Sequence, residues 1–328
     1  MKGAWSACIV LLSLMPAAVS AQSGPFPNKR IEIVVPGSPG GGQDLTARAI
    51  EATLRETRLI SQPMIVNNIA GAAGNLAKAY INRHKGDAHF FYTDTNRIYL
   101  NKIVGTTPLG IEDVTPLARL TAENLVWVVR ADSPLRSAQE ILDKVKADPA
   151  SVSFGIGTAV GNDLLHILRP AIAVGADPRK MRVVAFKSGG DLMIQLLGGH
   201  VTVISTGLSE AVEQVRSGQA RLLAVSAHER LSGEFAGVPN WRSMGINVSI
   251  RHWRGAFAPP GLSPDMVRFW DETLGRMVKT DAWKKTLEKY GWEDAYADSA
   301  TFRKDLEQER AIAAPILAQL GMVKDAKQ

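Results

Sequence analysis

The chain of 328 residues contains a single cysteine, Cys8, which lies inside an apolar N-terminal run. Everything after that run therefore has no thiol. This excludes disulfide frameworks, cysteine-based zinc sites and cysteine nucleophiles together. A chain of this length can instead be stabilised by burial of its own hydrophobic core.

Long hydrophobic runs are also missing beyond the N-terminus. Lys2 precedes apolar residues 9–15, and small residues then lead to Ala21. This pattern is typical of an export signal, and the run is shorter than the ~20 apolar residues that span a bilayer. We expect residues 1–21 to be a signal peptide, cleaved near Ala21, and the mature protein to be periplasmic.

Basic stripes with interleaved aromatic residues are absent as well. The chain has 38 Lys and Arg against 32 Asp and Glu, and its aromatic content is 6%. The basic residues are scattered along the chain, so nucleic acid is excluded as a partner. A modest positive charge suits an acidic small molecule.

Signatures of catalysis and metal binding are lacking. The six histidines show no metal-ligand spacing, and the sequence has neither a GxSxG elbow nor an HExxH motif. Gly155-x-Gly157 lacks the rest of the dinucleotide fingerprint. We expect no catalytic residue, metal or cofactor, and a periplasmic hydrolase or lyase is the competing class.

The length and the alternation of strands with amphipathic helices predict an α/β protein of about two domains with mostly parallel sheets. Strands are expected at 31–35, 64–66, 90–93, 126–129, 152–155, 182–185, 201–205, 221–227 and 255–258. The clearest helices are expected at 45–58, 137–147, 162–173, 190–197, 210–217, 264–279, 282–290 and 300–320.

The most informative segment, residues 31–44, reads IEIVVPGSPGGGQD. A β-branched strand runs into a glycine-rich turn, and Asp44 then has the character of a helix N-cap. The first N–H groups of such a helix have no intrahelical partner and attract carboxylates or phosphates. The alternative is that the glycines only make a tight turn.

Four more turns follow strands in the same way, at residues 67–75, 92–96, 155–163 and 186–191. In parallel sheets these turns lie beyond the carboxyl ends of the strands, so they converge on one crevice. Their small residues and free amide groups suit several oxyanions at once.

These motifs resemble a known family. They are VVPGSPGGGQD, NNIAGAAGN, GIGTAVGND, FKSGGD, LLGGHV and HWRGAFAPPGLSPD, spread over nearly the whole mature chain. The chain resembles the extracytoplasmic solute receptors of tripartite tricarboxylate transporters, also called Bug-type receptors, and its last motif resembles the tricarboxylate-receptor branch. It departs from the family pattern at Ile69 and Ala70, where Arg-Pro is usual, and at Thr202, where aspartate is common.

The resemblance implies a type II periplasmic-binding-protein fold, with two lobes of mostly parallel sheet flanked by helices and joined by a two-segment hinge. Lobe 1 would comprise residues 22–124 plus 250–328, and lobe 2 residues 125–249, with crossovers near Leu125 and Ile250. The implied function is that of a monomeric receptor that captures a small carboxylate, such as the tricarboxylate citrate, and delivers it to a membrane permease. An alternative is a component that presents its ligand to a membrane sensor kinase.

The resemblance also implies which residues bind the ligand. Asp44 would stiffen the first loop rather than touch an anion, and Lys187 would make a direct charge contact unless it is a solvated surface lysine. In the first lobe the candidates are Ser38, Pro39, Gly40, Gly41, Gly42, Asp44, Gly71, Gly74 and Asn75. In the second lobe they are Thr158, Gly161, Asn162, Lys187, Ser188, Gly189 and Thr206.

Four other side chains have two interpretations each. Arg97 could reach the cleft from the third loop or be an exposed arginine at a helix start. Trp253 and Arg254 could brace the second crossover or line the cleft. His166 falls on a helix after the fourth loop, where a core role is favoured over ligation.

Overall fold

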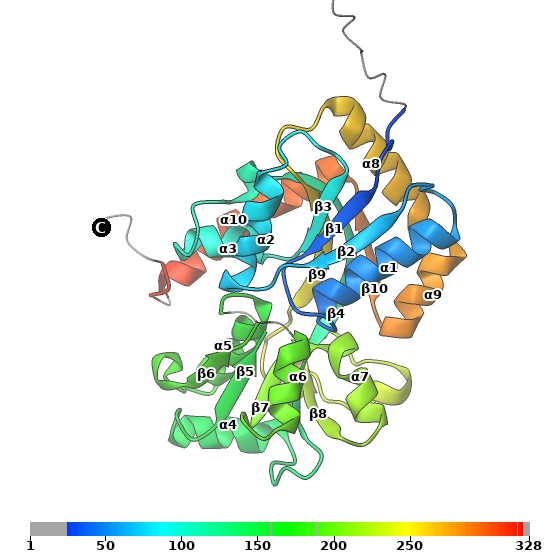
Figure 1. The fold of residues 1–328 in the computed structure, drawn as a ribbon. Coiled ribbons are helices and arrows are strands. Elements are labelled where there is room, and N and C mark those ends of the chain that lie inside the picture. The colour runs from blue at the N-terminus through cyan, green and yellow to red at the C-terminus, as the bar shows by residue number, and fades with distance from the viewer. Residues whose placement is uncertain (1–24, 158, 188, 320, 324–328) are drawn as a thin grey trace, which may run out of the picture.

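The structure is a computed structural model that describes residues 25–157, 159–187, 189–319 and 321–323. It has two lobes of α/β structure, one above the other in Figure 1. We call the upper one lobe 1, which carries β1–β3, β10, α1–α3 and α8–α10, and the lower one lobe 2, which carries β5–β8 and α4–α7.

Lobe 1 combines both ends of the described chain. Its strands are β1 (Ile31–Val35), β2 (Met64–Asn68), β3 (Phe90–Asp94) and β10 (Glu293–Ala297). Strand β1 pairs in parallel with β2 and with β3. Its helices are α1 (Gly42–Glu56), α2 (Asn75–Asn82), α3 (Arg97–Ile103), α8 (Pro264–Met277), α9 (Asp281–Tyr290) and α10 (Ser299–Gln319).

Lobe 2 is built from the middle of the chain. Its strands are β5 (Ser153–Ile156), β6 (Arg182–Ala185), β7 (Val203–Gly207) and β8 (Ala220–Val225). Strand β5 pairs in parallel with β6 and with β7. Its helices are α4 (Ala138–Ala147), α5 (Asn162–Ala173), α6 (Gly189–Leu197) and α7 (Leu208–Arg216).

One strand spans both lobes, and the chain crosses back to lobe 1 near Ile250. The 16-residue β4 (Thr115–Arg130) pairs with β9 (Arg251–Ala258) and β10 through its first part, and with β7 and β8 through its second part. All of these pairings are antiparallel, as is that of β9 with β3. The sheets are therefore parallel in their outer strands and mixed at the centre, where the chain crosses between the lobes.

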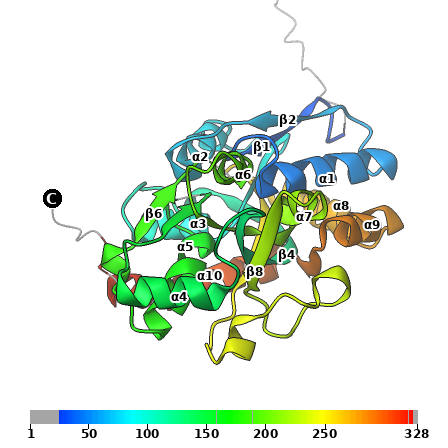
Figure 2. The same cartoon turned by 90° about the horizontal axis from the view of Figure 1, so that it is seen from below.

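Buried side chains point alternately to the two faces of a strand, so helices pack on both faces of the sheet. In β4, Leu125, Trp127 and Val129 join a core with α4 and α5, whereas Val126 and Val128 join a core with α6 and α7. This follows because successive side chains of a strand point to opposite faces. The view from below in Figure 2 shows α4 and α6 on opposite sides of these strands.

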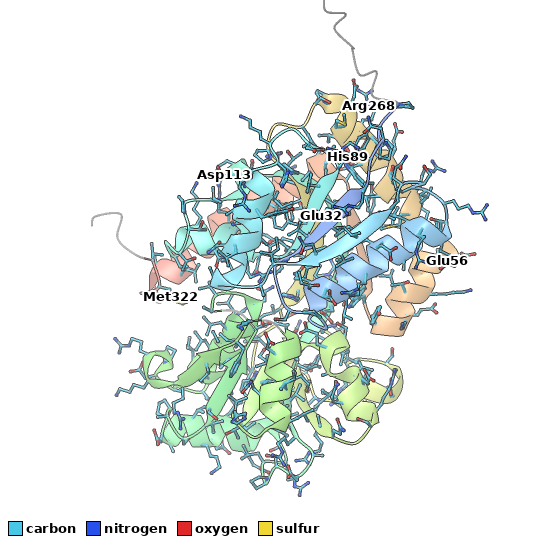
Figure 3. All side chains as sticks on the ribbon, viewed as in Figure 1. Glu32, Glu56, His89, Asp113, Arg268 and Met322 are labelled. Carbon is cyan, nitrogen blue, oxygen red and sulfur yellow. The ribbon has the colours of Figure 1, made fainter. Side chains whose placement is uncertain are left out.

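The outer surface of lobe 1 is charged and lies away from the junction of the lobes. Glu56 and Arg268, labelled in Figure 3, project from the outer parts of α1 and α8. No helix within the described ranges combines the length and the apolar composition that crossing a bilayer requires.

Most predicted elements are confirmed within a few residues, and the parallel order of the outer strands agrees with the topology. Strand β4 is much longer than predicted, and β10, α2 and α3 are not among the predicted elements. The first part of β4 reads TPLARLTAEN, which mixes buried and polar residues without clean alternation. Pairing with β9 and β10 stabilises it, and a local pattern cannot anticipate such a contact.

His166 is a core residue, as predicted. It is fully buried on α5, and its Nε2 accepts a hydrogen bond from the Trp241 indole at 2.7 Å. An indole N–H only donates, so the ring proton lies on Nδ1 and donates to Ser205 Oγ at 2.9 Å. Burial lowers the pKa of His166 to about 3, so the neutral ring is part of the lobe 2 core.

Candidate functional site

A cavity of about 50 Å³ lies between the lobes, which is room for a few water molecules. Lobe 1 contributes the β1–α1 and β3–α3 loops, and lobe 2 contributes the β5–α5 loop and the first turns of α6 and α7. Strand β9 closes the cavity with His252 and Arg254. The converging loops lie where the strand order predicts a binding crevice.

Asp44 organises the glycine loop but does not cap the helix. Helix α1 begins at Gly42 with Gly41 as N-cap, so the predicted Asp44 N-cap is wrong by three residues. The Asp44 carboxylate accepts hydrogen bonds from the Gly40 N–H and from Asn68 Nδ2, both at 3.0 Å. It lies in the first turn, where a negative charge is favourable and the loop is stiffened.

The N-terminus of α1 is already occupied by a carboxylate from the opposite lobe. The Gly42 N–H donates to Glu210, which also accepts from the Thr206 hydroxyl and from the Gly207 N–H at 3.2 Å. Glu210 lies in the first turn of α7, so both helix starts face it. An internal carboxylate thus occupies an amide that the sequence assigned to the ligand.

Two further bonds join the lobes around the cavity. Ser38 Oγ donates to Asp191 Oδ2 at 2.8 Å, and Asn96 Nδ2 donates to Asn162 Oδ1 at 2.7 Å. Together with the Gly42 bond to Glu210, they hold the two lobes against each other. The structure is therefore a closed conformation.

The most deeply buried charge at the cavity is Arg254, whose side chain is 2% exposed. Its Nη1 forms an ion pair with Glu123, which is completely buried, and its guanidinium lies 5.9 Å from the Trp292 ring centre. Arg254 Nε has no hydrogen-bond partner among the described residues. A buried unpaired donor costs about 1–3 kcal/mol, so this group is suited to an anionic partner.

Two other charged groups line the same cavity. Arg97 is 3% exposed and forms an ion pair with Asp94 at 2.8 Å. Burial, reinforced by the charge of Glu210, raises the pKa of Asp163 to about 7. Burial likewise raises the pKa of Glu123, against the opposing effect of Arg254.

His252 completes the wall beside Arg254. Burial lowers the pKa of His252 well below its usual value, and the neighbouring Arg254 and Arg97 charges act in the same direction. Its ring is therefore neutral at physiological pH. Within the described ranges no three histidine, cysteine, aspartate or glutamate side chains gather in a way that would hold a metal ion.

The sequence-predicted residues fall into several groups in the structure. Those that line the cavity are Ser38, Gly41, Gly42, Asp44, Gly161, Asn162 and Gly189. Pro39 and Gly40 line a neighbouring groove against α6, and Thr206 is buried on β7 behind Glu210.

The other predicted residues do not line the cavity. Gly74 packs behind Arg97 and Pro36, and Asn75 accepts a hydrogen bond from Asn101 at α3. Gly71 and the exposed Lys187 also lie outside its lining. Thr158 and Ser188 lie outside the described residues.

The sequence left two interpretations open for Arg97 and for Arg254, and the structure places both in the lining of the cavity. Arg97 and Arg254 are buried and line it, whereas Trp253 donates to Glu309 on the other side of β9. Asp163 and Glu210 were not predicted. Asp163 directly follows a predicted residue, but only its position beside Glu210 distinguishes it from an ordinary first-turn acid.

Gly42 touches the Arg254 guanidinium so closely that no side chain fits between them. A Cβ atom built on Gly42 would lie 1.9 Å from Arg254 Nη2. We expect Gly42→Ala to displace Arg254 and weaken ligand binding at least tenfold, because overpacking of this kind typically costs 1–3 kcal/mol. Isothermal titration with the acid that stabilises the wild type most tests this.

Gly237→Ala is the matched control, because no atom lies within 4 Å of its added Cβ. Wild-type affinity in Gly42→Ala would show that Arg254 can move without consequence.

Two α/β lobes joined by β4 and by the return crossing near Ile250, with a polar cavity between them, have the fold of periplasmic binding proteins. The chain belongs to the tripartite tricarboxylate transporter family of receptors, since the model of the "Tripartite tricarboxylate transporter family receptor" matches residues 46–322. Its members are periplasmic solute-binding receptors and not enzymes.

Three known proteins illustrate the similarity. The "UPF0065 protein in gbd 5'region" of Cupriavidus necator is 25% identical over 95% of this chain and 93% of its own. The structure of MatC from Rhodopseudomonas palustris with bound malate superposes with a TM-score of 0.80 at 21% identity, covering 89% of this chain and 100% of its own. A second R. palustris protein, solved with adipate, gives a TM-score of 0.82 at 21% identity over 91% and 99%.

Proposed function

We propose that this receptor captures a small carboxylate between its lobes and delivers it to a tripartite tricarboxylate transporter permease. The observation that carries the proposal is Arg254, a buried guanidinium at the cavity with an unpartnered Nε. The start of α5 adds main-chain N–H groups, which suit carboxylate oxygens.

We propose that the ligand carries fewer charges than citrate. Asp44, Asp163 and Glu210 already line the cavity. Three further carboxylates would add strong repulsion in a closed, poorly solvated space. The similar proteins solved with malate and adipate hold acids with two carboxyl groups. The tricarboxylate preference indicated by the sequence resemblance stays a prediction to be tested beside shorter acids.

We propose that the two lobes move relative to each other and that their boundaries are those expected from the sequence. Lobe 1 then comprises residues 22–124 plus 250–328, and lobe 2 comprises residues 125–249. Support comes from β4, whose partners change from β9 to β7 and β8 near Leu125. Ser226 adds support, because its hydroxyl bridges the Leu125 N–H and the Ile250 carbonyl, so both crossovers meet at one point. The closed, loaded monomer would then dock on the permease.

A thermal-shift screen tests the proposed function. Protein purified from the periplasm, denatured, refolded and free of ligand is screened against tri-, di- and monocarboxylates, aromatic acids and amino acids. A ligand at ~100 times its dissociation constant stabilises the folded state by ~2.7 kcal/mol, a rise of several degrees in melting temperature. If no acid raises the melting temperature, the carboxylate-receptor function is wrong.

A further inference from the structure

Glu210 holds a position that the sequence assigned to a ligand carboxylate. It lies in the first turn of α7 in lobe 2, and its carboxylate accepts a hydrogen bond from the Gly42 N–H at the start of α1 in lobe 1. The unpaired N–H groups of a helix start attract a carboxylate whatever molecule carries it. The Gly42 N–H therefore has two alternative acceptors, one from the ligand and one from the protein.

The surroundings of Gly42 suit an anion from either source. The Arg254 guanidinium touches Gly42 so closely that a Cβ atom added there would clash with Nη2. Arg254 is 2% exposed, and its Nε has no hydrogen-bond partner among the described residues. An amide N–H and a buried guanidinium thus lie side by side, and one carboxylate can satisfy both.

A ligand carboxylate and Glu210 cannot share the Gly42 N–H. A backbone amide carries a single hydrogen to donate, and two carboxylates beside it would repel each other strongly in the poorly solvated cleft. Burial raises the pKa of Asp163 to about 7, and the charge of Glu210 acts in the same direction, so another negative charge here is unfavourable. Binding of a carboxylate at the start of α1 therefore requires Glu210 to leave.

The structure leaves room for Glu210 to move. Its side chain is half-buried and lines two spaces, the cavity between the lobes and a groove of about 830 Å³ that α6 and α7 line. Lys289 of α9 lines the same groove. Rotation of the Glu210 side chain toward this groove would release the Gly42 N–H and bring the carboxylate toward a cation.

The bond between Glu210 and Gly42 also acts across the junction of the lobes, so it forms only when they are closed. The lobes pack tightly beside it, because a Cβ atom on Gly190 of α6 would lie 2.6 Å from the Pro39 carbonyl oxygen. The bond from Ser38 to Asp191 joins the lobes as well, but it involves no main-chain amide. Substitution can therefore separate the two bonds.

We propose that Glu210 is an internal competitor of the ligand, which occupies the start of α1 and holds the lobes in a closed, unloaded state. We call this the self-occupied state. The inference rests on the proposed carboxylate-receptor function and adds a regulatory contact to it. The ligand binds only to the fraction of receptors that are not self-occupied, so its apparent affinity is reduced by that fraction.

Two variants separate competition from closure. Glu210→Ala removes a bond that exists only in the self-occupied state, so the apparent affinity should rise, by about tenfold for a self-occupied population of ~90%. Ser38→Ala removes a bond that the self-occupied and the loaded states share, so the affinity should not rise. Both variants should increase the radius of gyration of the ligand-free protein, measured by small-angle X-ray scattering.

The affinities are measured by isothermal titration of the full processed protein, refolded free of ligand, with malate, adipate and citrate as probes. Glu210→Asp is a second variant that retains the cap of α7, just as Asp113 accepts from the Gly110 N–H at 2.7 Å. Its carboxylate is one methylene shorter, so the bond to lobe 1 is weakened and the affinity should again rise. Glu213→Ala, at an exposed acid one turn along α7, is the control and should behave as wild type.

The outcomes distinguish the inference from the function on which it rests. Weaker binding by both Glu210 variants would mean that Glu210 shapes the loaded site. Unchanged affinity with an unchanged radius of gyration would mean that the self-occupied state is not populated. Either result overturns the competitor role while the carboxylate-receptor function stands. Binding of no acid by any of these proteins, with the wider acid panel included, overturns both.

Discussion

Replacing Arg254 with methionine should abolish ligand binding and lower the free energy of unfolding by about 3–5 kcal/mol at pH 7. Arg254 forms an ion pair with the fully buried Glu123. Removing one partner of such a pair leaves the other as an uncompensated charge in a low-dielectric interior, which is the source of the cost. Urea denaturation followed by tryptophan fluorescence measures the stability, and titration measures binding.

The double variant Glu123→Gln/Arg254→Met separates the two roles of Arg254. Without the Glu123 charge, most of the lost stability should return, because two neutral side chains of similar volume are tolerated in such a position. Ligand binding should not return, since the group that contacts the carboxylate is still missing. A double variant that binds as tightly as the wild type would contradict the role given to Arg254.

Asp163→Asn should stabilise the ligand-free protein above pH 7 and leave it nearly unchanged below pH 4. The folded-state pKa of Asp163, about 7, is above its ordinary value of 3.8. The folded state therefore binds this proton more tightly than the unfolded state, and stability is lost as the pH rises between these values. With ~1.36 kcal/mol per pKa unit, the variant should gain about 2–4 kcal/mol at pH 8.

The measurement is the difference in free energy of unfolding between wild type and Asp163→Asn at each pH from 4 to 8. Taking this difference removes the contributions of His166, His252 and Glu123, which both proteins share. Asp143→Asn, at an exposed aspartate on α4, should show no such trend. A difference that does not grow with pH would mean that Asp163 is ionised at no cost in the closed cleft.

Much of the fold could be predicted because it follows local rules. The strand at residues 31–35 is rich in β-branched residues and fully buried, and the glycines that follow it end the strand in a turn. Helices α4, α8 and α9 begin at side chains that act as N-caps, namely Ser137, Ser263 and Thr280. The first half of β4 and strand β10 lacked such signals, since each depends on its partner in the sheet.

The candidate site was likewise predictable from the sequence only in part. The sequence predicted the loops that meet at the cavity, because parallel strands bring their carboxyl ends to one edge. It could not predict that Glu210 would bond to Gly42, a residue 168 positions away. It also could not place Lys187 outside the cavity or Arg254 inside it, because the orientation of a charged side chain depends on lobe closure.

By itself, the sequence determined the class of protein, the glycine loops and the absence of thiol chemistry after residue 8, since these depend on composition and short-range pattern. Only the tertiary structure decided which charges share the cavity. Arg254, Glu123, Asp163 and Glu210 come from four different elements, and their effects on one another arise from distance and desolvation in the closed cleft. Coulomb interactions depend on separation in space, which the order of residues along the chain does not contain.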